Sequence, residues 1–328
     1  MHRLLTVREE VFPLRETFRI SRGARTEARV LVCEIAEGEV IGRGECTPYP
    51  RYGETMDDVA RAIAAIGPAI AGGLDREGLQ SAMRPGAARN AVDCALWDLE
   101  AKRARRRVWE LAGLPEPAPV TTAYTLSVDS PEAMGRAAAA AAARPLLKLK
   151  LAGDGKDGAR VAAVRRNAPA ARIIVDANES LTLEEARAVA PILAEAGVEL
   201  LEQPLHADAD EALRGVALPV PLGADESCHD TATLSRLVGL YQVVNIKLDK
   251  TGGLTEALRL RAAARAAGLR VMVGCMLASS LAMAPAHLVA QGADFVDIDG
   301  PLLLARDRAP GLRYEGSLVH PPEALLWG

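Results

Sequence analysis

Short apolar runs alternate with alanine-rich stretches over residues 119–304, and this alternation limits the possible folds more than any other feature. Such a pattern is typical of parallel strands joined by crossover helices. Eight runs recur at intervals of roughly 20 to 30 residues, close to the period of a (β/α) barrel. We expect strands at 121–128, 146–150, 172–176, 199–202, 220–225, 243–247, 271–275 and 295–299. The predicted fold class is α/β, a (β/α)7β TIM-like barrel.

The first 118 residues have a different pattern. Residues 12–20 and 28–35 alternate apolar and polar side chains around Ser21-Arg22-Gly23, which predicts two strands. Residues 56–70 and 87–102 carry apolar side chains at three- and four-residue spacing, which predicts two helices. A proline-rich stretch at 113–117 marks the boundary. We therefore expect an α+β capping domain at 1–118, completed by about 305–328, and a modified TIM barrel at 119–304.

The composition narrows the class of partner. The chain has 43 acidic and 39 basic residues and a net charge of −4, so it lacks the basic field that binds nucleic acid. A small molecule is the expected partner, and a homo-oligomer stays open. The five cysteines are scattered without CxxC spacing, which argues against disulfides or zinc and fits a cytoplasmic location. No apolar run approaches the roughly 18 residues of a membrane span, so we expect neither a membrane protein nor export.

Four consecutive apolar runs each end in an ionisable residue: Asp176, Glu202, Asp225 and Lys247. The C-terminal strand ends of a (β/α) barrel converge on its active site, so these residues are expected to meet at one mouth. Three carboxylates there would repel one another unless a cation lay between them. A single acid would more often be a helix cap or a salt-bridge partner, but three at successive strand ends favour a metal site. All-oxygen ligands favour Mg²⁺, with Mn²⁺ as a substitute, over zinc.

Lysines flank these acids in the sequence. Lys148 and Lys150 lie two apart on the second strand and therefore on the same face, where we expect each to lower the pKa of the other towards that of a general base. Lys247 ends the sixth strand, four strands on from Lys150, so it should lie across the barrel mouth. Two lysines on opposite sides of one carbon can remove a proton from one face and return it to the other. A metal-stabilised enediolate would link the two steps.

The order of these residues resembles the dipeptide epimerases of the muconate-lactonising subgroup of the enolase superfamily. The resemblance extends over nearly the whole chain and also rests on residues 44–53, 87–99, 175–180, 224–229 and 244–253. It implies Mg²⁺-dependent epimerisation of the C-terminal residue of a dipeptide, with L-Ala-D/L-Glu as favoured substrate, as in murein peptide recycling. It also implies that Lys150 and Lys247 are the opposed acid/bases, that Lys148 assists Lys150, and that the metal ligands are Asp176, Glu202 and Asp225.

Two further groups of residues match substrate contacts in this family. Asp297 and Asp299, on one face of the last strand, match the pair that receives the ammonium of the dipeptide. Arg22 or Arg25, in the N-terminal loop, could pair with the side-chain carboxylate of glutamate. Gly252-Gly253 are interpreted as a tight turn, because they lack the fuller motif of a phosphate-binding loop.

Two other functions remain open from the sequence. One is a lyase or cycloisomerase of the same superfamily, such as an o-succinylbenzoate synthase, which would use one lysine as its base. Asp297 and Asp299 weigh against it, because an anionic or neutral substrate offers them no ammonium. The other is a non-catalytic metabolite-binding barrel, which the complete set of lysines and acids disfavours.

Overall fold

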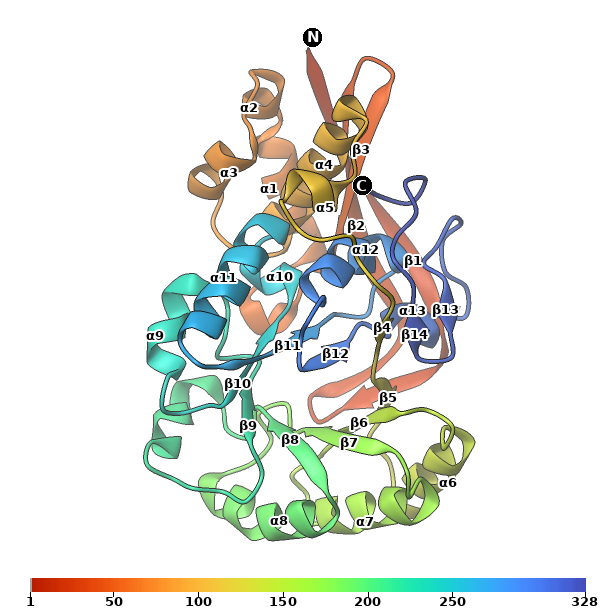
Figure 1. Ribbon diagram of the computed structural model, residues 1–328, viewed down its shortest axis with the longest axis vertical. Helices are drawn as coiled ribbons and strands as arrows, with labels where there is room; N and C mark the ends of the chain where they lie inside the picture. Colours follow the sequence, from red (N-terminus) through yellow and green to blue (C-terminus); the bar gives the residue numbers. More distant parts are fainter. Residues whose placement is uncertain (1) are drawn as a thin grey trace.

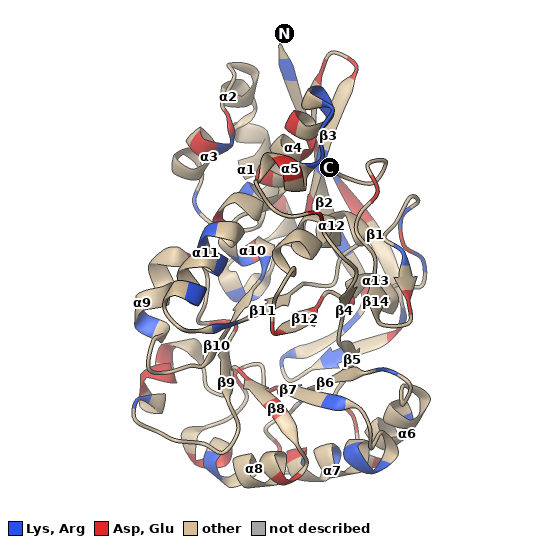
Figure 2. Ribbon diagram, in the orientation of Figure 1, with Lys and Arg blue, Asp and Glu red and all other residues tan. Residues whose placement is uncertain are grey.

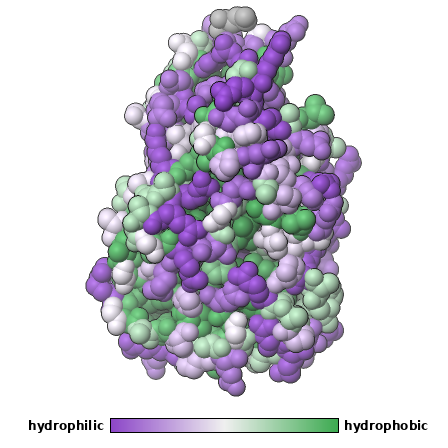
Figure 3. Space-filling view, in the orientation of Figure 1, coloured by the Kyte–Doolittle hydropathy of each residue, from purple (hydrophilic) through white to green (hydrophobic). Residues whose placement is uncertain are grey.

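The computed structural model describes residues 2–328 and consists of a sheet-and-helix cap above a ring of eight strands (Figure 1). Basic and acidic residues are interspersed over both parts (Figure 2). On the face in view, hydrophobic residues lie in patches between hydrophilic ones (Figure 3). Within residues 2–328, no helix has the length and apolarity needed to cross a membrane.

The cap begins with an antiparallel sheet of order β1-β2-β3, formed by β1 (Arg3–Ile20), β2 (Gly23–Glu37) and β3 (Val40–Cys46). The helix η1 (Pro50–Tyr52) and five α-helices follow: α1 (Met56–Ala65), α2 (Gly67–Ala71), α3 (Arg76–Ala82), α4 (Ala87–Ala104) and α5 (Val108–Leu111). Helix α4 can pack closely on β3 because Gly42 and Gly44 have no side chains. A Cβ at either position would overlap the backbone of α4.

The prediction of one helix over residues 56–70 is wrong, since the segment forms two helices. Helix α1 ends at Ala65 and α2 starts at Gly67, with Pro68 in its first turn. Proline lacks the amide hydrogen that a continuous helix needs and clashes with the preceding turn, so the chain starts a new helix there. The predicted strands and the helix over 87–102 are confirmed, with β1 and β2 longer than expected.

The barrel confirms the predicted succession of eight parallel strands. They lie side by side in chain order, and Ala123 N donates to Val296 O at 2.8 Å, joining the first and last strand segments. Asp225, Lys247 and Asp299 lie just beyond their strands rather than in them. The strands are β5 (Tyr124–Leu126), β6 (Leu146–Lys150), β7 (Arg172–Asp176), β8 (Val198–Glu202), β9 (Leu222–Ala224), β10 (Val243–Ile246), β11 (Arg270–Gly274) and β12 (Phe295–Asp297).

Helices cover the outside of the ring, as crossover connections require (Figure 1). Short helical turns replace full crossover helices between β8 and β10. The helices of this unit are α6 (Pro131–Ala140), α7 (Asp157–Asn167), α8 (Leu183–Glu195), η2 (Ala207–Leu213), η3 (Thr231–Thr233), α9 (Leu234–Leu237), α10 (Leu248–Thr251), α11 (Leu254–Ala266), α12 (Ser280–Val289) and α13 (Gly300–Leu303).

The interior of the barrel is layered by the two-residue period of its strands. A compact apolar cluster closes the bottom of the ring and consists of Ala123, Leu146, Ile174, Leu200, Val243, Met272 and Phe295. Two residues further along these strands, the same inward face carries polar side chains, among them Lys148, Asp176 and Glu202. The strand period therefore places a water-excluding base directly beneath the charged residues.

The C-terminal segment contacts both parts of the molecule. Strands β13 (Tyr314–Glu315) and β14 (Leu318–Val319) form a small antiparallel sheet with β4 (Val120–Thr121). Val108 N donates to Gly328 O at 3.0 Å, and Arg308 forms a 2.6 Å ion pair with Glu45. The division of the chain near residues 118 and 305 stays a prediction.

Candidate active site

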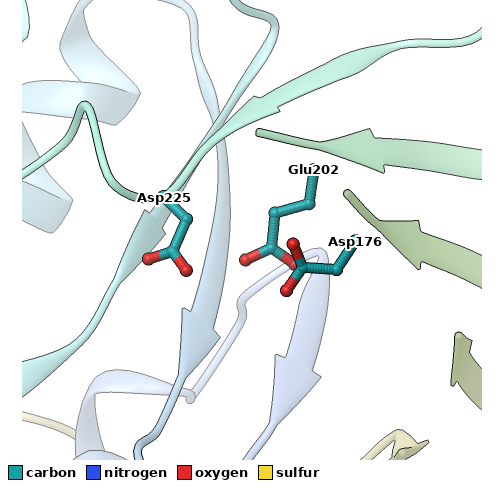
Figure 4. A group of neighbouring side chains, drawn as sticks. All are labelled: Asp176, Glu202 and Asp225. Atoms are coloured by element: carbon teal, nitrogen blue, oxygen red, sulfur yellow. The ribbon is translucent and has the colours of Figure 1, made fainter. Parts of the chain in front are cut away.

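The three acids that end successive strands come together at the barrel mouth. Asp176 closes β7, Glu202 closes β8 and Asp225 follows β9, and one carboxylate oxygen from each lies within 4.8 Å of the others. All three side chains are fully buried. Figure 4 shows Glu202 between the two aspartates, with the carboxylates turned towards a common centre.

These acids fit a divalent cation. Buried charges need compensation, and three carboxylates within this distance repel one another strongly. Glu202 Oε2 accepts no hydrogen bond within the described chain, although Lys148 Nζ lies 2.7 Å away outside hydrogen-bond geometry. Glu202 Oε2 is thus a buried oxygen that receives no hydrogen bond and lies beside two further carboxylates. Three carboxylates offer the oxygen ligands that Mg²⁺ prefers.

The predicted lysines surround this cluster. Lys150 Nζ donates to Asp176 Oδ2 at 2.6 Å, and Lys247 Nζ donates to Asp225 Oδ2 at the same distance. Asp176 and Asp225 flank Glu202, so the two lysines approach the cluster from opposite sides. This position follows from the topology, because Lys150 ends β6 and Lys247 follows β10, four strands apart in the ring.

Lys148 lies deeper than Lys150 and contacts more acids. Its Nζ is 2.8 Å from Asp297 Oδ2 and 3.2 Å from Asp176 Oδ2, in addition to the Glu202 contact. Burial lowers the pKa of Lys148, but the carboxylates, with Asp297 foremost, outweigh it and raise the pKa well above its ordinary value. The expectation that a neighbouring lysine lowers this pKa is therefore wrong here, because the acids around the ammonium outnumber the cations.

Burial raises the pKa of two acids at the site, Glu202 and Asp299. It raises the pKa of Glu202, assisted by the charges of Asp176 and Asp225. It also raises the pKa of Asp299 to about 7, with the neighbouring Asp297 as the second cause. A cation close to these groups would relieve both unfavourable effects.

Asp297 and Asp299 border a cavity of about 490 Å³ between the barrel mouth and the cap. Asp297 pairs with Lys148, whereas Asp299 Oδ2 accepts a hydrogen bond from Thr125 N at 2.7 Å. No cation within residues 2–328 forms an ion pair with Asp299. The hairpin of β1 and β2 extends from the cap towards the barrel (Figure 1). Arg22 and Arg25, in this hairpin, both line the cavity.

The two hairpin arginines have different surroundings. Arg22 donates to Asn178 O at 2.8 Å, to Glu226 Oε1 at 2.6 Å and to Glu179 Oε2 at 3.2 Å. Arg25 has no ion-pair partner in the described part of the chain, and its guanidinium carbon lies 5.4 Å from the ring centre of Tyr49. Arg22 therefore anchors the hairpin to the barrel, whereas Arg25 lines the cavity without an ion-pair partner in residues 2–328.

Sequence reasoning missed residues that surround the acids. Lys250 is fully buried and donates to Asp225 Oδ1, and Asn245 donates to Glu202 Oε1, both at 2.6 Å. A signal was present for each: Asn245 lies two residues before Lys247 on an inward strand face, and Lys250 lies three residues after it, about one helical turn away. Glu226 follows Asp225 directly and also borders the cavity.

Comparisons with known proteins agree with this arrangement. The family model described as the N-terminal domain of mandelate racemase/muconate lactonizing enzyme matches residues 2–113. The model described as enolase C-terminal domain-like matches residues 133–324.

Three relatives illustrate the similarity. The L-Ala-D/L-Glu epimerase of Escherichia coli is 46% identical over 97% of this chain and 99% of its own. The N-acetyl-D-glutamate racemase of a Pseudoalteromonas species is 43% identical over 91% of this chain and 95% of its own. A solved enolase family member from Agrobacterium tumefaciens, with homology to dipeptide epimerases and with sodium and L-Ala-L-Glu bound, is 52% identical. It superposes with a TM-score of 0.97 over 99% of this chain and 100% of its own.

The first two relatives are an epimerase and a racemase, and they do not favour the lyase or cycloisomerase alternative. The barrel, the cap and the order of the site residues agree with the same assignment. The chain is thus an isomerase and belongs to the dipeptide epimerases of the mandelate racemase/muconate lactonizing enzyme family, in the enolase superfamily.

Proposed function

We propose that this protein epimerises the C-terminal residue of a dipeptide, with L-Ala-D/L-Glu as the favoured substrate. The observation that carries the proposal is the placement of Lys150 and Lys247 on opposite sides of one carboxylate cluster, each 2.6 Å from a different aspartate. A carbon held between two such groups can lose a proton on one face and gain one on the other.

Asp176, Glu202 and Asp225 would hold the metal, which we propose is Mg²⁺ with Mn²⁺ as a substitute. A metal ion held there would supply positive charge that stabilises the charge developing on the substrate carboxylate and would lower the proton affinity of nearby ammonium groups. Cap residues line the cavity together with barrel residues, so a bound substrate would displace water from it and thereby strengthen these electrostatic interactions.

The lysines carry the proton transfer. In one direction, neutral Lys150 takes the α-proton while the ammonium of Lys247 gives a proton to the opposite face of the same carbon. In the other direction the roles reverse, so no net proton is gained or lost. Lys148, which touches Asp176, Glu202 and Asp297, would hold the acids in place around the reacting carboxylate and assist Lys150.

Asp297 and Asp299 would receive the N-terminal ammonium. Lys148 already forms an ion pair with Asp297. Asp299 accepts a hydrogen bond from Thr125 N but has no cationic partner within residues 2–328, so the ammonium would form its ion pair. Arg25 would pair with the side-chain carboxylate of glutamate, because the guanidinium of Arg22 already donates to Asn178 O and Glu226 of the barrel. Arg22 would then act on the substrate only through the position of the hairpin.

The first experiment is incubation of L-Ala-L-Glu with the enzyme in D₂O after removal of metal by EDTA, with Mg²⁺, Mn²⁺ or Na⁺ added back. We expect α-deuterium in the glutamyl residue and formation of L-Ala-D-Glu with Mg²⁺ and Mn²⁺. The Na⁺ sample matters because the Agrobacterium tumefaciens structure holds sodium. Absence of exchange with every cation would refute the proposal.

The second experiment separates a dipeptide from an N-acylated amino acid. N-acetyl-L-glutamate keeps the amide and both carboxylates of L-Ala-L-Glu but lacks its ammonium. We expect it to have a kcat/KM roughly 10–100-fold lower, the value of a charge-assisted hydrogen bond. Asp299→Asn should reduce the preference for the dipeptide, whereas an equal or higher kcat/KM for N-acetyl-L-glutamate would favour a racemase like that of the Pseudoalteromonas species.

We also propose a cytoplasmic location and a role in recycling the peptides of peptidoglycan. All five cysteines are free, and Cys33, Cys46, Cys94 and Cys228 are buried, which suits a reducing compartment. Cell fractionation with antibody detection tests the location. Isotope tracing of murein-derived L-Ala-D-Glu in cells lacking the enzyme tests the role, because the unepimerised dipeptide should accumulate.

A further inference from the structure

Each candidate metal ligand has one oxygen bound by a donor outside the carboxylate cluster. Asn178 N donates to Asp176 Oδ1 at 2.8 Å. Asn245 Nδ2 donates to Glu202 Oε1 at 2.6 Å, and Lys250 Nζ donates to Asp225 Oδ1 at 2.6 Å. We call these three donors the outer donors: Asn178 N, Asn245 Nδ2 and Lys250 Nζ.

The second oxygen of each carboxylate faces the lysines of the cavity. Asp225 Oδ2 accepts from Lys247, and Glu202 Oε2 has only the Lys148 contact. Asp176 Oδ2 accepts from Lys150 at 2.6 Å and also from Asn178 Nδ2 at 3.2 Å. Asn245 and Lys250 thus divide Glu202 and Asp225 each into a held oxygen and an oxygen that faces the site, whereas Asn178 contacts both oxygens of Asp176.

Lys250 is the most unusual of the outer donors, because it is a buried cation that the proposed proton transfer does not use. Its side chain is fully buried, and its Nζ also donates to Asp225 O at 2.5 Å and to Asn245 O at 2.9 Å. All three ammonium hydrogens are therefore assigned to protein acceptors. Such a lysine has no donor left for a substrate.

Asn245 is held by packing and by its hydrogen bond to Glu202, and its buried Oδ1 has no hydrogen-bond partner within residues 2–328. Its side chain occupies the space above Gly274, where an added Cβ would lie 2.7 Å from Asn245 Oδ1. Its backbone carbonyl accepts from Lys250, so the strand end and helix α10 support each other. One short segment, residues 245–250, therefore holds two of the three candidate ligands.

We propose that Lys250 and Asn245 are positioning residues that make Asp225 and Glu202 bind the divalent cation through one oxygen each. Single-oxygen binding keeps coordination positions free for a substrate carboxylate, whereas bidentate carboxylates would fill them. Lys250 also supplies a fixed positive charge that favours three acids in one buried cluster without occupying the oxygens that face the site. The inference rests on the proposed metal site but not on the identity of the dipeptide.

The test compares two lysines on one carboxylate. Lys250→Met removes the cation from the held oxygen of Asp225, and Lys247→Met removes a cation from the oxygen that faces the site. Mn²⁺ affinity, measured by electron paramagnetic resonance and by calorimetry, should fall 10–100-fold in Lys250→Met, as for other residues that orient metal ligands. In Lys247→Met it should be unchanged or higher, because a cation that competes for Asp225 is gone.

Changes in the Mn²⁺ spectrum give a readout that loss of stability alone would not produce. Lys250→Met should alter the zero-field splitting of bound Mn²⁺, because Asp225 can then rotate and offer both oxygens. An affinity within twofold of the wild type with an unchanged spectrum, or an equal loss in both variants, would overturn the inference.

A second variant keeps the test decisive if Lys250→Met does not fold. Asn245→Ala removes a neutral amide from Glu202 and should lower Mn²⁺ affinity by about tenfold while keeping the circular dichroism spectrum. A folded Asn245→Ala with wild-type affinity would contradict the proposal. Because Mn²⁺ binding is measured without substrate, a wild-type enzyme that binds metal but exchanges no dipeptide would refute the proposed function and leave this inference standing.

Discussion

Asp249 provides a quantitative test of the contact between the cap and the barrel. Its carboxylate is buried, and Oδ1 accepts hydrogen bonds from Thr47 N at 3.0 Å and from Asn90 Nδ2 at 2.8 Å, both in the cap. Burial raises the pKa of Asp249 from 3.8 to about 7. The proton therefore binds more tightly in the folded protein than in the unfolded chain.

The sign of the pH effect follows from this difference. Below about pH 4 the carboxyl is protonated in both states, so its ionisation does not affect stability. Between about pH 4 and 7 the unfolded chain ionises it while the folded protein keeps the proton, so folding is opposed by about 1.4 kcal/mol per pH unit. Above pH 7 this cost is constant at about 4 kcal/mol, from a shift of about 3 units.

Asp249→Asn should remove this cost while keeping an oxygen for Thr47 and Asn90. Thermal unfolding with EDTA present should show a melting temperature that rises relative to wild type by on the order of 2–3 °C per pH unit between pH 5 and 7. The difference should level off above pH 7.

Asp208→Asn serves as the control, because it makes the same substitution at a side chain that is 90% exposed to solvent. A difference between Asp249→Asn and wild type that stays constant from pH 5 to 8 would refute the reasoning. So would a pH-dependent difference of equal size in the control.

Three further outcomes are expected. Lys150→Ala and Lys247→Ala should each abolish epimerisation but keep α-deuterium exchange with one stereoisomer, a different one for each variant, as measured by mass spectrometry. Near wild-type epimerisation in either variant would exclude that lysine as a base. Gly252→Ala should lower stability by at least about 1–2 kcal/mol in urea unfolding, because φ is +75° and a Cβ would lie 2.5 Å from Arg89 Nε. Glu179→Gln should raise KM more than it lowers kcat for all dipeptides tested, because Glu179 pairs with the cap through two arginines; an unchanged KM would refute this role.

The strand-end residues could be predicted because the barrel turns sequence order into spatial order. Asp176 and Glu202 close buried strands, and a side-chain period of two places both on the inward face above the apolar cluster. Lys150 and Lys247 could be placed on opposite sides by counting strands. Neither inference needed a side-chain contact, since both depend only on parallel strands in chain order.

Properties that depend on side-chain contacts could not be predicted in this way. The pKa of Lys148 depends on how many carboxylates surround its ammonium, and the choice between Arg22 and Arg25 depends on which one reaches Glu226. Lys250 has no strand period to place it, because it lies on a single helical turn after β10. Whether Lys250 reaches Asp225 depends on how helix α10 is oriented relative to β10.

Contacts with the cap fix the orientation of α10. Arg89 of α4 donates to Thr251 O at 2.7 Å and to Gly252 O at 3.1 Å, at the C-terminal end of α10. Asp93 of α4 accepts from Thr255 N at 3.0 Å. The Gly252-Gly253 turn is confirmed as a turn and has positive φ at both residues, which lets α4 approach without a clash.

Residues 87–99 and 244–253, two separate motifs in the sequence, are therefore the two sides of one interface. Asn90 adds the contact to Asp249, between the two lysines of this segment, Lys247 and Lys250. The cap therefore does more than line the cavity: through α4 it fixes the segment that carries Lys247, the proposed acid/base, and two outer donors. Weakening this interface should disturb metal affinity and proton transfer together, even though no cap residue of α4 borders the cavity.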